Sequence, residues 1–178
     1  MRRWNGWIAG AWGMAEAVLW FVVPDVFLTW VAMRRGVRPA LRLSLVAVAG
    51  AIGGGLLVYG WGAAMPEAGA TAMAALPGID AAMVEEVRGE VAASGNMALL
   101  SGPRQAQPYK LYALAAGDLG MSAVTLALWT VPGRAFRFVI SSLGTGLVAT
   151  VARRFVGEQW LVAGWAATWT AIYIALWL

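Results

Sequence analysis

Hydrophobic and polar positions follow one another along this chain in long blocks. Apolar runs cover residues 6–33, 43–65, 111–131 and 160–178, and most charged side chains gather in the short stretches between them. A membrane-spanning helix needs about 20 consecutive, predominantly apolar residues. Because these runs reach that length, the pattern predicts an all-α integral membrane protein that forms a single membrane domain over residues 1–178.

The first apolar run, residues 6–33, is longer than one span and contains Pro24 in its second half. Proline removes a backbone donor and disfavours helix at the preceding residue. Two half-helices that meet near "WFVVPD" would form a re-entrant hairpin, whose irregular tip must be covered by protein or water. One long, kinked and tilted helix is the alternative.

A second interrupted segment occupies residues 97–118. Its apolar start, "NMALL", is too short to span, and Gly102, Pro103 and Pro108 then break the chain before a new apolar run. We expect a second re-entrant hairpin here. The break carries the basic residues Arg104 and Lys110, whereas the first hairpin carries acids.

The other segments complete the expected arrangement. Residues 43–65 form a glycine-rich transmembrane helix, whose small residues serve helix packing or, alternatively, border a substrate path. Residues 66–96 hold five of the nine acids, and apolar residues recur at helical spacing in their second half. That spacing predicts an amphipathic helix, with a solvated connector as the alternative. Transmembrane helices are expected over residues 119–152, and a last span over residues 160–178.

Composition supports the membrane assignment and excludes several chemistries. Hydrophobic residues make up 61% of the chain and charged residues 12%, whereas soluble domains have about 45–50% and 25%. The chain has neither cysteine nor histidine, so the ordinary ligands of zinc, copper and haem and the usual base of a nucleophilic enzyme are missing. We therefore expect no metal, no cofactor and no enzymatic activity.

The basic residues point to membrane orientation. The net charge of +4 arises from short arginine clusters beside apolar runs, which is typical of cytoplasmic loops and not of a nucleic-acid interface. The cluster Arg34, Arg35, Arg38 and Arg42 predicts the cytoplasmic side. If Arg134 and Arg137 also lie there, one further span places Arg153 and Arg154 outside, which the positive-inside rule disfavours. The sequence leaves this topology open.

The start of the chain resembles a signal peptide only in part. "MRRWNGWIAGAWGMAEA" has a basic beginning and a small-residue motif around Glu16. The apolar run continues past that motif, so we expect a retained segment.

Charged residues inside the apolar regions are the candidate functional residues. A charge at the centre of an inserted helix costs about 2.5–3.5 kcal/mol, and such residues usually mark an ion path, a substrate path or a proton relay. A carboxylate in apolar surroundings holds its proton more readily, which suits a proton-sensitive gate. Arginine binds phosphate oxygens through its planar fork. The set is Glu16, Asp25, Arg104, Lys110, Asp118, Arg134 and Arg137.

Several of these residues have simpler explanations. Asp25 follows Pro24 and is a candidate cap of the returning half-helix. Asp118 is a candidate interfacial residue, and Arg134 and Arg137 share a helical face from which they could reach lipid headgroups.

Four stretches together resemble the DedA family of membrane proteins, also called the VTT or SNARE-associated Golgi protein family. They are "AEAVLWFVVPD", "GAIGGGLLVYGWG", "PYKLYALAAGDLGM" and "GRAFRF", and the similarity covers roughly residues 10–145. The resemblance implies two re-entrant hairpins in an inverted repeat, with Glu16 and Asp25 on the acidic hairpin. Lys110 falls where the family has an arginine after its proline, and the family's Arg-Phe-x-Pro-x-x-Arg motif is not intact here.

The resemblance also implies a function. Family members are implicated in moving lipids between leaflets, and bacterial ones in recycling undecaprenyl phosphate with the proton motive force. We therefore expect an inner-membrane lipid translocase, flippase-like or scramblase-like, for a phosphate-bearing lipid, with protons as a candidate coupling ion. A non-transporting scaffold that binds partners through residues 66–96 is the alternative, and a metal-dependent phospholipid enzyme is a weaker one. The oligomeric state, a homo-oligomer included, is left open.

Overall fold

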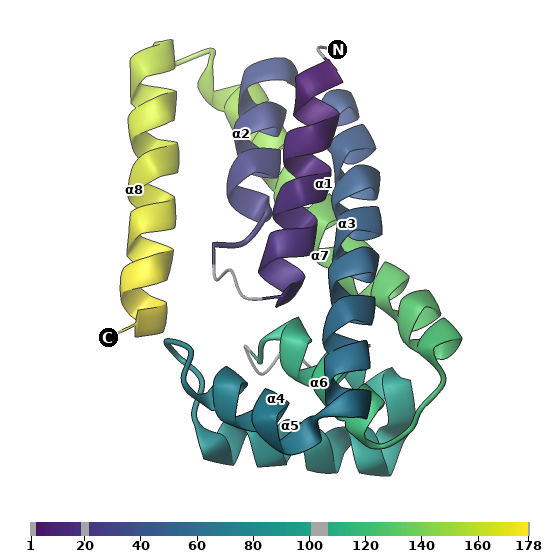
Figure 1. The fold of residues 1–178 in the computed structure, drawn as a ribbon. Helices are drawn as coiled ribbons and strands as arrows, with labels where there is room; N and C mark the ends of the chain where they lie inside the picture. Colours follow the sequence, from purple (N-terminus) through teal and green to yellow (C-terminus); the bar gives the residue numbers. More distant parts are fainter. Residues whose placement is uncertain (1–2, 19–21, 101–106, 178) are drawn as a thin grey trace.

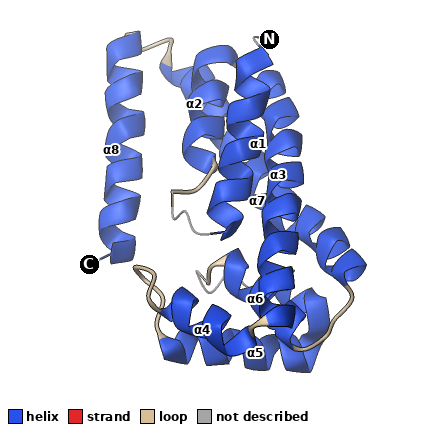
Figure 2. Cartoon of the chain, in the orientation of Figure 1, coloured by secondary structure: helices blue, strands red, loops and turns tan. Residues whose placement is uncertain are grey.

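The computed structural model describes residues 3–18, 22–100 and 107–177, and within these ranges all regular structure is helical (Figures 1 and 2). The elements are α1 (Arg3–Val18), α2 (Asp25–Arg35), α3 (Val37–Ala64), α4 (Pro66–Ala74), α5 (Ala81–Ser94), the 3₁₀ helix η1 (Gly95–Leu100), α6 (Tyr109–Asp118), α7 (Ala123–Ala152) and α8 (Glu158–Trp177).

The break expected in the first apolar run is confirmed. Helix α1 ends at Val18, α2 begins at Asp25, and the chain reverses its direction between them (Figure 1). Pro24 occupies the N-cap position of α2, so Asp25 is not the cap but the first residue of the helix. A carboxylate in the first turn is still favourable, because the helix macrodipole places partial positive charge there.

Helix α3 is the axis on which the two interrupted segments pack. A Cβ atom added at Gly50 would overlap the carbonyl oxygen of Gly10 in α1, and one added at Gly54 would overlap that of Met14. Only glycine lets two helix backbones approach this closely. The glycines of α3 therefore seat α1 against the first half of that helix.

The second half of α3 receives α6 in the same manner. A Cβ atom at Gly62 would overlap the carbonyl oxygen of Leu114, and one at Gly117 would overlap that of Tyr59. At Gly55 the added atom would meet the hydroxyl group of Tyr109, the first residue of α6. The end of α1 and the start of α6 thus reach α3 at the adjacent residues Gly54 and Gly55.

Residues 119–152, where we expected more than one transmembrane helix, contain a single helix, α7, that runs through Pro132. Arg134 and Arg137 therefore lie inside a helix and not in a loop. The chain leaves α7 at Arg153, whose guanidinium donates a 2.5 Å hydrogen bond to the carbonyl oxygen of Met33 in α2. Arg153 accordingly lies at the same end of the bundle as Arg34, which removes the topological conflict seen in the sequence.

Helices α4 and α5 lie across the opposite end of the bundle (Figure 1). The side chain of Asp80 accepts a 2.7 Å hydrogen bond from the backbone N–H of Met83 and caps α5. Val84, Val87 and Val91 are buried, whereas Glu85 and Glu86 are exposed. The amphipathic helix expected in the second half of residues 66–96 is confirmed.

Two of the described helices, α3 and α7, are long and apolar enough to cross a membrane. The apolar window of α7 is only 22% buried within the bundle, and large side chains on its outer side are exposed. They include Leu128, Phe136, Ile140, Leu147 and Val148. The expected C-terminal span, residues 160–178, lies largely within α8, whose described side chains are mostly exposed too.

Candidate charged site inside the bundle

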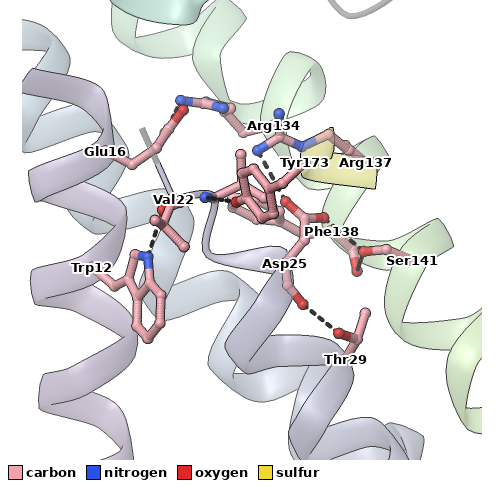
Figure 3. Close-up of polar contacts among 11 residues, drawn as sticks. Trp12, Glu16, Val22, Asp25, Thr29, Arg134, Arg137, Phe138, Ser141 and Tyr173 are labelled. Carbon is pink, nitrogen blue, oxygen red and sulfur yellow. Dashed lines mark hydrogen bonds and ion pairs between the residues drawn. The ribbon is translucent and has the colours of Figure 1, made fainter. Parts of the chain in front are cut away.

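A buried ion pair joins the first segment of the chain to α7. Glu16, two residues before the end of α1, accepts a hydrogen bond from Nη2 of Arg134 (Figure 3). Only 6% of Glu16 and 5% of Arg134 are exposed. The guanidinium also lies 4.5 Å from the ring centroid of Tyr109, within the range of a cation–π interaction. Because each charge has a partner, the pair is compatible with this depth of burial.

A second acid, Asp25, lies at the start of the next helix, α2. Asp25, 2% exposed, has its Oδ2 atom 3.0 Å from Nη2 of Arg137, and its Oδ1 atom accepts a 2.7 Å hydrogen bond from Ser141 (Figure 3). The arginine and the serine are four residues apart on α7 and thus on one face of that helix. Two acids from the first segment therefore meet two arginines from α7.

Aromatic side chains supply hydrogen-bond partners to backbone groups in the helix break between α1 and α2. The indole N–H of Trp12 donates a 2.7 Å hydrogen bond to the carbonyl oxygen of Val22, and the backbone N–H of Val23 donates a 3.0 Å hydrogen bond to the hydroxyl of Tyr173. Backbone polar groups outside a helix need such partners in an apolar environment. The break is thus built into the bundle next to the charged residues (Figure 3).

The second interrupted segment brings Lys110 to the same region. Lys110 is 4% exposed, and its charge interacts with those of Glu16 and Arg134. The preceding residue, Tyr109, shares a 2.7 Å hydrogen bond with Thr130 of α7. The two interrupted segments therefore both contribute to one group of residues, which we name the charged site: Glu16, Asp25, Lys110, Arg134 and Arg137.

One of the residues singled out in the sequence, Asp118, is not part of this group. Asp118 lies at the other end of α6 and pairs with Arg88 of α5 at 2.5 Å. That hydrogen bond, together with the charge of the carboxylate, raises the pKa of the Arg88 guanidinium. Arg104 lies outside the described residues.

The arginines retain hydrogen-bonding capacity. Among the described residues, Nε of Arg134 and both Nε and Nη2 of Arg137 are buried without a hydrogen-bond partner. The contact between Arg137 and Asp25 is close enough for an ion pair, but it is not aligned as a hydrogen bond. Guanidinium N–H groups bind carboxylate or phosphate oxygens strongly, so these unused donors could bind a further anion.

Four further residues of the site were not among the candidates in the sequence: Thr130, Ser141, Tyr109 and Tyr173. The first two lie four residues before Arg134 and four after Arg137, so the helical face that carries the arginines could have pointed to them. The two tyrosines had no local signal, because their partners are distant in the chain.

Comparisons with protein-family models, with curated proteins and with solved structures return no match. The described residues also contain no group of three or more acidic side chains placed to hold a metal ion.

Proposed function

We propose that this chain is a multi-pass inner-membrane protein that moves a phosphate-bearing lipid, such as undecaprenyl phosphate or a phospholipid, between leaflets. The resemblance to the DedA family supports this reading, and so do the two helices long enough to span a bilayer. The many exposed apolar side chains on α7 and α8 agree with lipid contact.

The proposal includes two re-entrant hairpins in an inverted arrangement. Its support is the packing on α3, where α1 and α6 occupy opposite halves and come together at Gly54 and Gly55. A lipid headgroup could then cross the middle of the bilayer near the point where the end of α1 and the start of α6 meet on α3.

The observation that carries the proposal is a pair of arginines beside two acids, the buried Arg134 and the half-buried Arg137, which have buried N–H groups without a hydrogen-bond partner among the described residues. An N–H group without a partner raises the free energy of the folded protein in an apolar medium unless a ligand binds it. Charged residues at such positions usually mark a functional site. A lipid phosphate fits them by charge and by hydrogen-bond geometry.

The charged site also suggests how the phosphate is handled. Arg137 is the more accessible of the two arginines, with 35% of its side chain exposed, and its bond to Asp25 is poorly aligned. In this proposal a phosphate meets the exposed part of Arg137 first, and the buried donors of Arg137 and Arg134 become available to it as it moves inward. Glu16 competes with the phosphate for Arg134, and its protonation would favour the lipid-bound state, which couples movement to protons.

Reconstituted protein provides the test. Transbilayer movement of undecaprenyl phosphate and of a fluorescent phosphatidylglycerol would be measured in liposomes at two pH values. We expect fast movement by the wild type, loss of at least tenfold in Arg137→Gln and Arg134→Ala, and loss of the pH dependence in Glu16→Gln. Arg88→Gln, which removes an arginine outside the charged site, is the matched control and should behave as the wild type.

The scaffold alternative makes the opposite prediction. If well-folded wild-type protein moves neither lipid, the translocase proposal fails. A scaffold would also keep its cellular activity when the charges of the site are neutralised, provided that the protein remains folded.

A further inference from the structure

Helix α8 is attached to the bundle in an unusual way. Its backbone makes hardly any close approach to the other described helices, and it stands apart from them in Figure 1. It is held by long side chains instead. The indole N–H groups of Trp165 and Trp169 each donate a 3.0 Å hydrogen bond to Oγ1 of Thr29, and the hydroxyl of Tyr173 accepts from Val23.

These contacts all end on α2 or on the chain break before it. Thr29 itself donates a 2.6 Å hydrogen bond to the backbone carbonyl of Asp25, one turn earlier. Tyr173 lies beside Asp25 and Arg137 (Figure 3). The side of the charged site that contains the more accessible arginine is therefore the side that α8 covers.

The two ends of α8 are held differently. At its start, Glu158 forms an ion pair with Arg34, and the ring of Trp165 lies 5.0 Å from that of Trp30. Farther along, among the described side chains of this helix, only the tyrosine hydroxyl reaches the chain break. In the C-terminal half of α8, the described contacts with the rest of the bundle are two hydrogen bonds, from Trp169 to Thr29 and from Val23 to Tyr173. Loss of these two bonds would leave this half free to swing about the N-terminal end, which the ion pair and the Trp30–Trp165 ring contact hold.

From this arrangement we infer that α8 is a lateral gate over the charged site, with Tyr173 as its closing residue and Thr29 as its latch. Outward movement of the C-terminal half of α8 would uncover Arg137 to the lipid side, without rearrangement of α1, α3 or α7. The use of the gate by a phosphate-bearing lipid rests on the proposed function, whereas the gate movement itself does not.

The test combines isosteric removal of the latch with a distance measurement. Thr29→Val removes the acceptor of both indoles, and Tyr173→Phe removes the acceptor of the Val23 N–H while keeping the ring. Because the chain has no cysteine, spin labels can be placed at Leu57→Cys on α3 and Ala171→Cys on α8, both exposed positions. Double electron–electron resonance in liposomes then reports the position of α8.

The double variant Thr29→Val/Tyr173→Phe should shift the closed–open equilibrium by roughly two- to tenfold for each hydrogen bond lost, giving a new population at a different distance. Thr168→Val is the matched control, because that hydroxyl donates to the carbonyl oxygen of Gly164 in its own helix and, within the described part of the chain, to no other helix. The control should keep the wild-type distance distribution.

The outcomes separate the gate from the translocase. A new distance population together with lipid movement altered at least threefold supports both. A new population in protein that moves no phosphate lipid supports the gate and overturns the proposed function. A distance distribution that is unchanged in the double variant overturns the gate, whatever the lipid assay shows.

Discussion

Glu16 and Arg134 are 118 positions apart in the chain, and their buried ion pair joins α1 to α7. The pair lies beside the break that Pro24 introduces and beside the start of α6. Arg134 of α7 thus contacts both interrupted segments, the first through Glu16 and the second through the ring of Tyr109.

Neutralising one member of this pair should destabilise the protein strongly. Removing one partner of a buried ion pair costs about 3–5 kcal/mol, because the remaining charge stays buried without compensation. We expect Glu16→Gln and Arg134→Gln each to lower the free energy of unfolding in detergent, and the double variant to lose clearly less than the sum. Strictly additive losses in this double-mutant cycle would show that the two side chains do not interact.

The glycines of α3 provide a sharp test of the helix packing. Gly54→Ala should cost about 1–3 kcal/mol, because its Cβ atom would collide with the backbone of Met14 and the side chain of Ala17. Gly53→Ala is the matched control on the same helix, since nothing lies within 4 Å of the added atom. Thermal unfolding of both variants in detergent checks the difference. Equal melting temperatures would contradict the close approach of α1.

The ion pair between Arg88 and Asp118 should matter little. Its side chains are partly exposed, and pairs of this kind contribute about 0–1 kcal/mol. Asp118→Asn should therefore change the unfolding free energy by less than about 1 kcal/mol, and the small effect should fade at high salt because surface charges are screened. Lipid movement should be unchanged as well. A loss of movement as large as that in Arg134→Ala would return Asp118 to the substrate path.

The position of the chain reversals predicts which ends of the helices share a side of the membrane. Phe155→Cys and Arg38→Cys, at one end of the bundle, should react from the same side with a membrane-impermeant maleimide. Met65→Cys, at the other end of α3, should react from the opposite side. Labelling in intact cells and in inverted vesicles distinguishes the two sides. Reaction of Phe155→Cys and Arg38→Cys from different sides would mean that α7 does not cross as a single helix.

Local features of the sequence anticipated much of the helical organisation. Pro24 marked the first break because its ring cannot continue a helix, and the spacing of Val84, Val87 and Val91 identified the buried face of α5. Residues 119–152 were anticipated less well. The apolar run that covers residues 111–131 ends inside α7, and the helix continues through Pro132 and the arginines after it.

The candidate residues were also anticipated only in part. Glu16, Asp25, Lys110, Arg134 and Arg137 stood out because charge is unusual inside an apolar run, and that is a property of the sequence alone. Asp118 stood out for the same reason, but the fold places it at the far end of α6 with Arg88. The sequence could recognise unusual charges but could not sort them into groups.

Helix formation, the interruption of a helix by proline and the presence of a charge in apolar surroundings depend on neighbours within a few residues, so these features can be predicted along the chain. The tertiary structure alone decided that Glu16 meets Arg134, that Asp25 meets Arg137 and that Tyr173 reaches the break at Val23. Such pairings depend on which helix faces pack together, and close approach at glycines of α3 governs that choice for α1 and α6. No pattern of neighbouring residues in the sequence predicts which helix faces pack together.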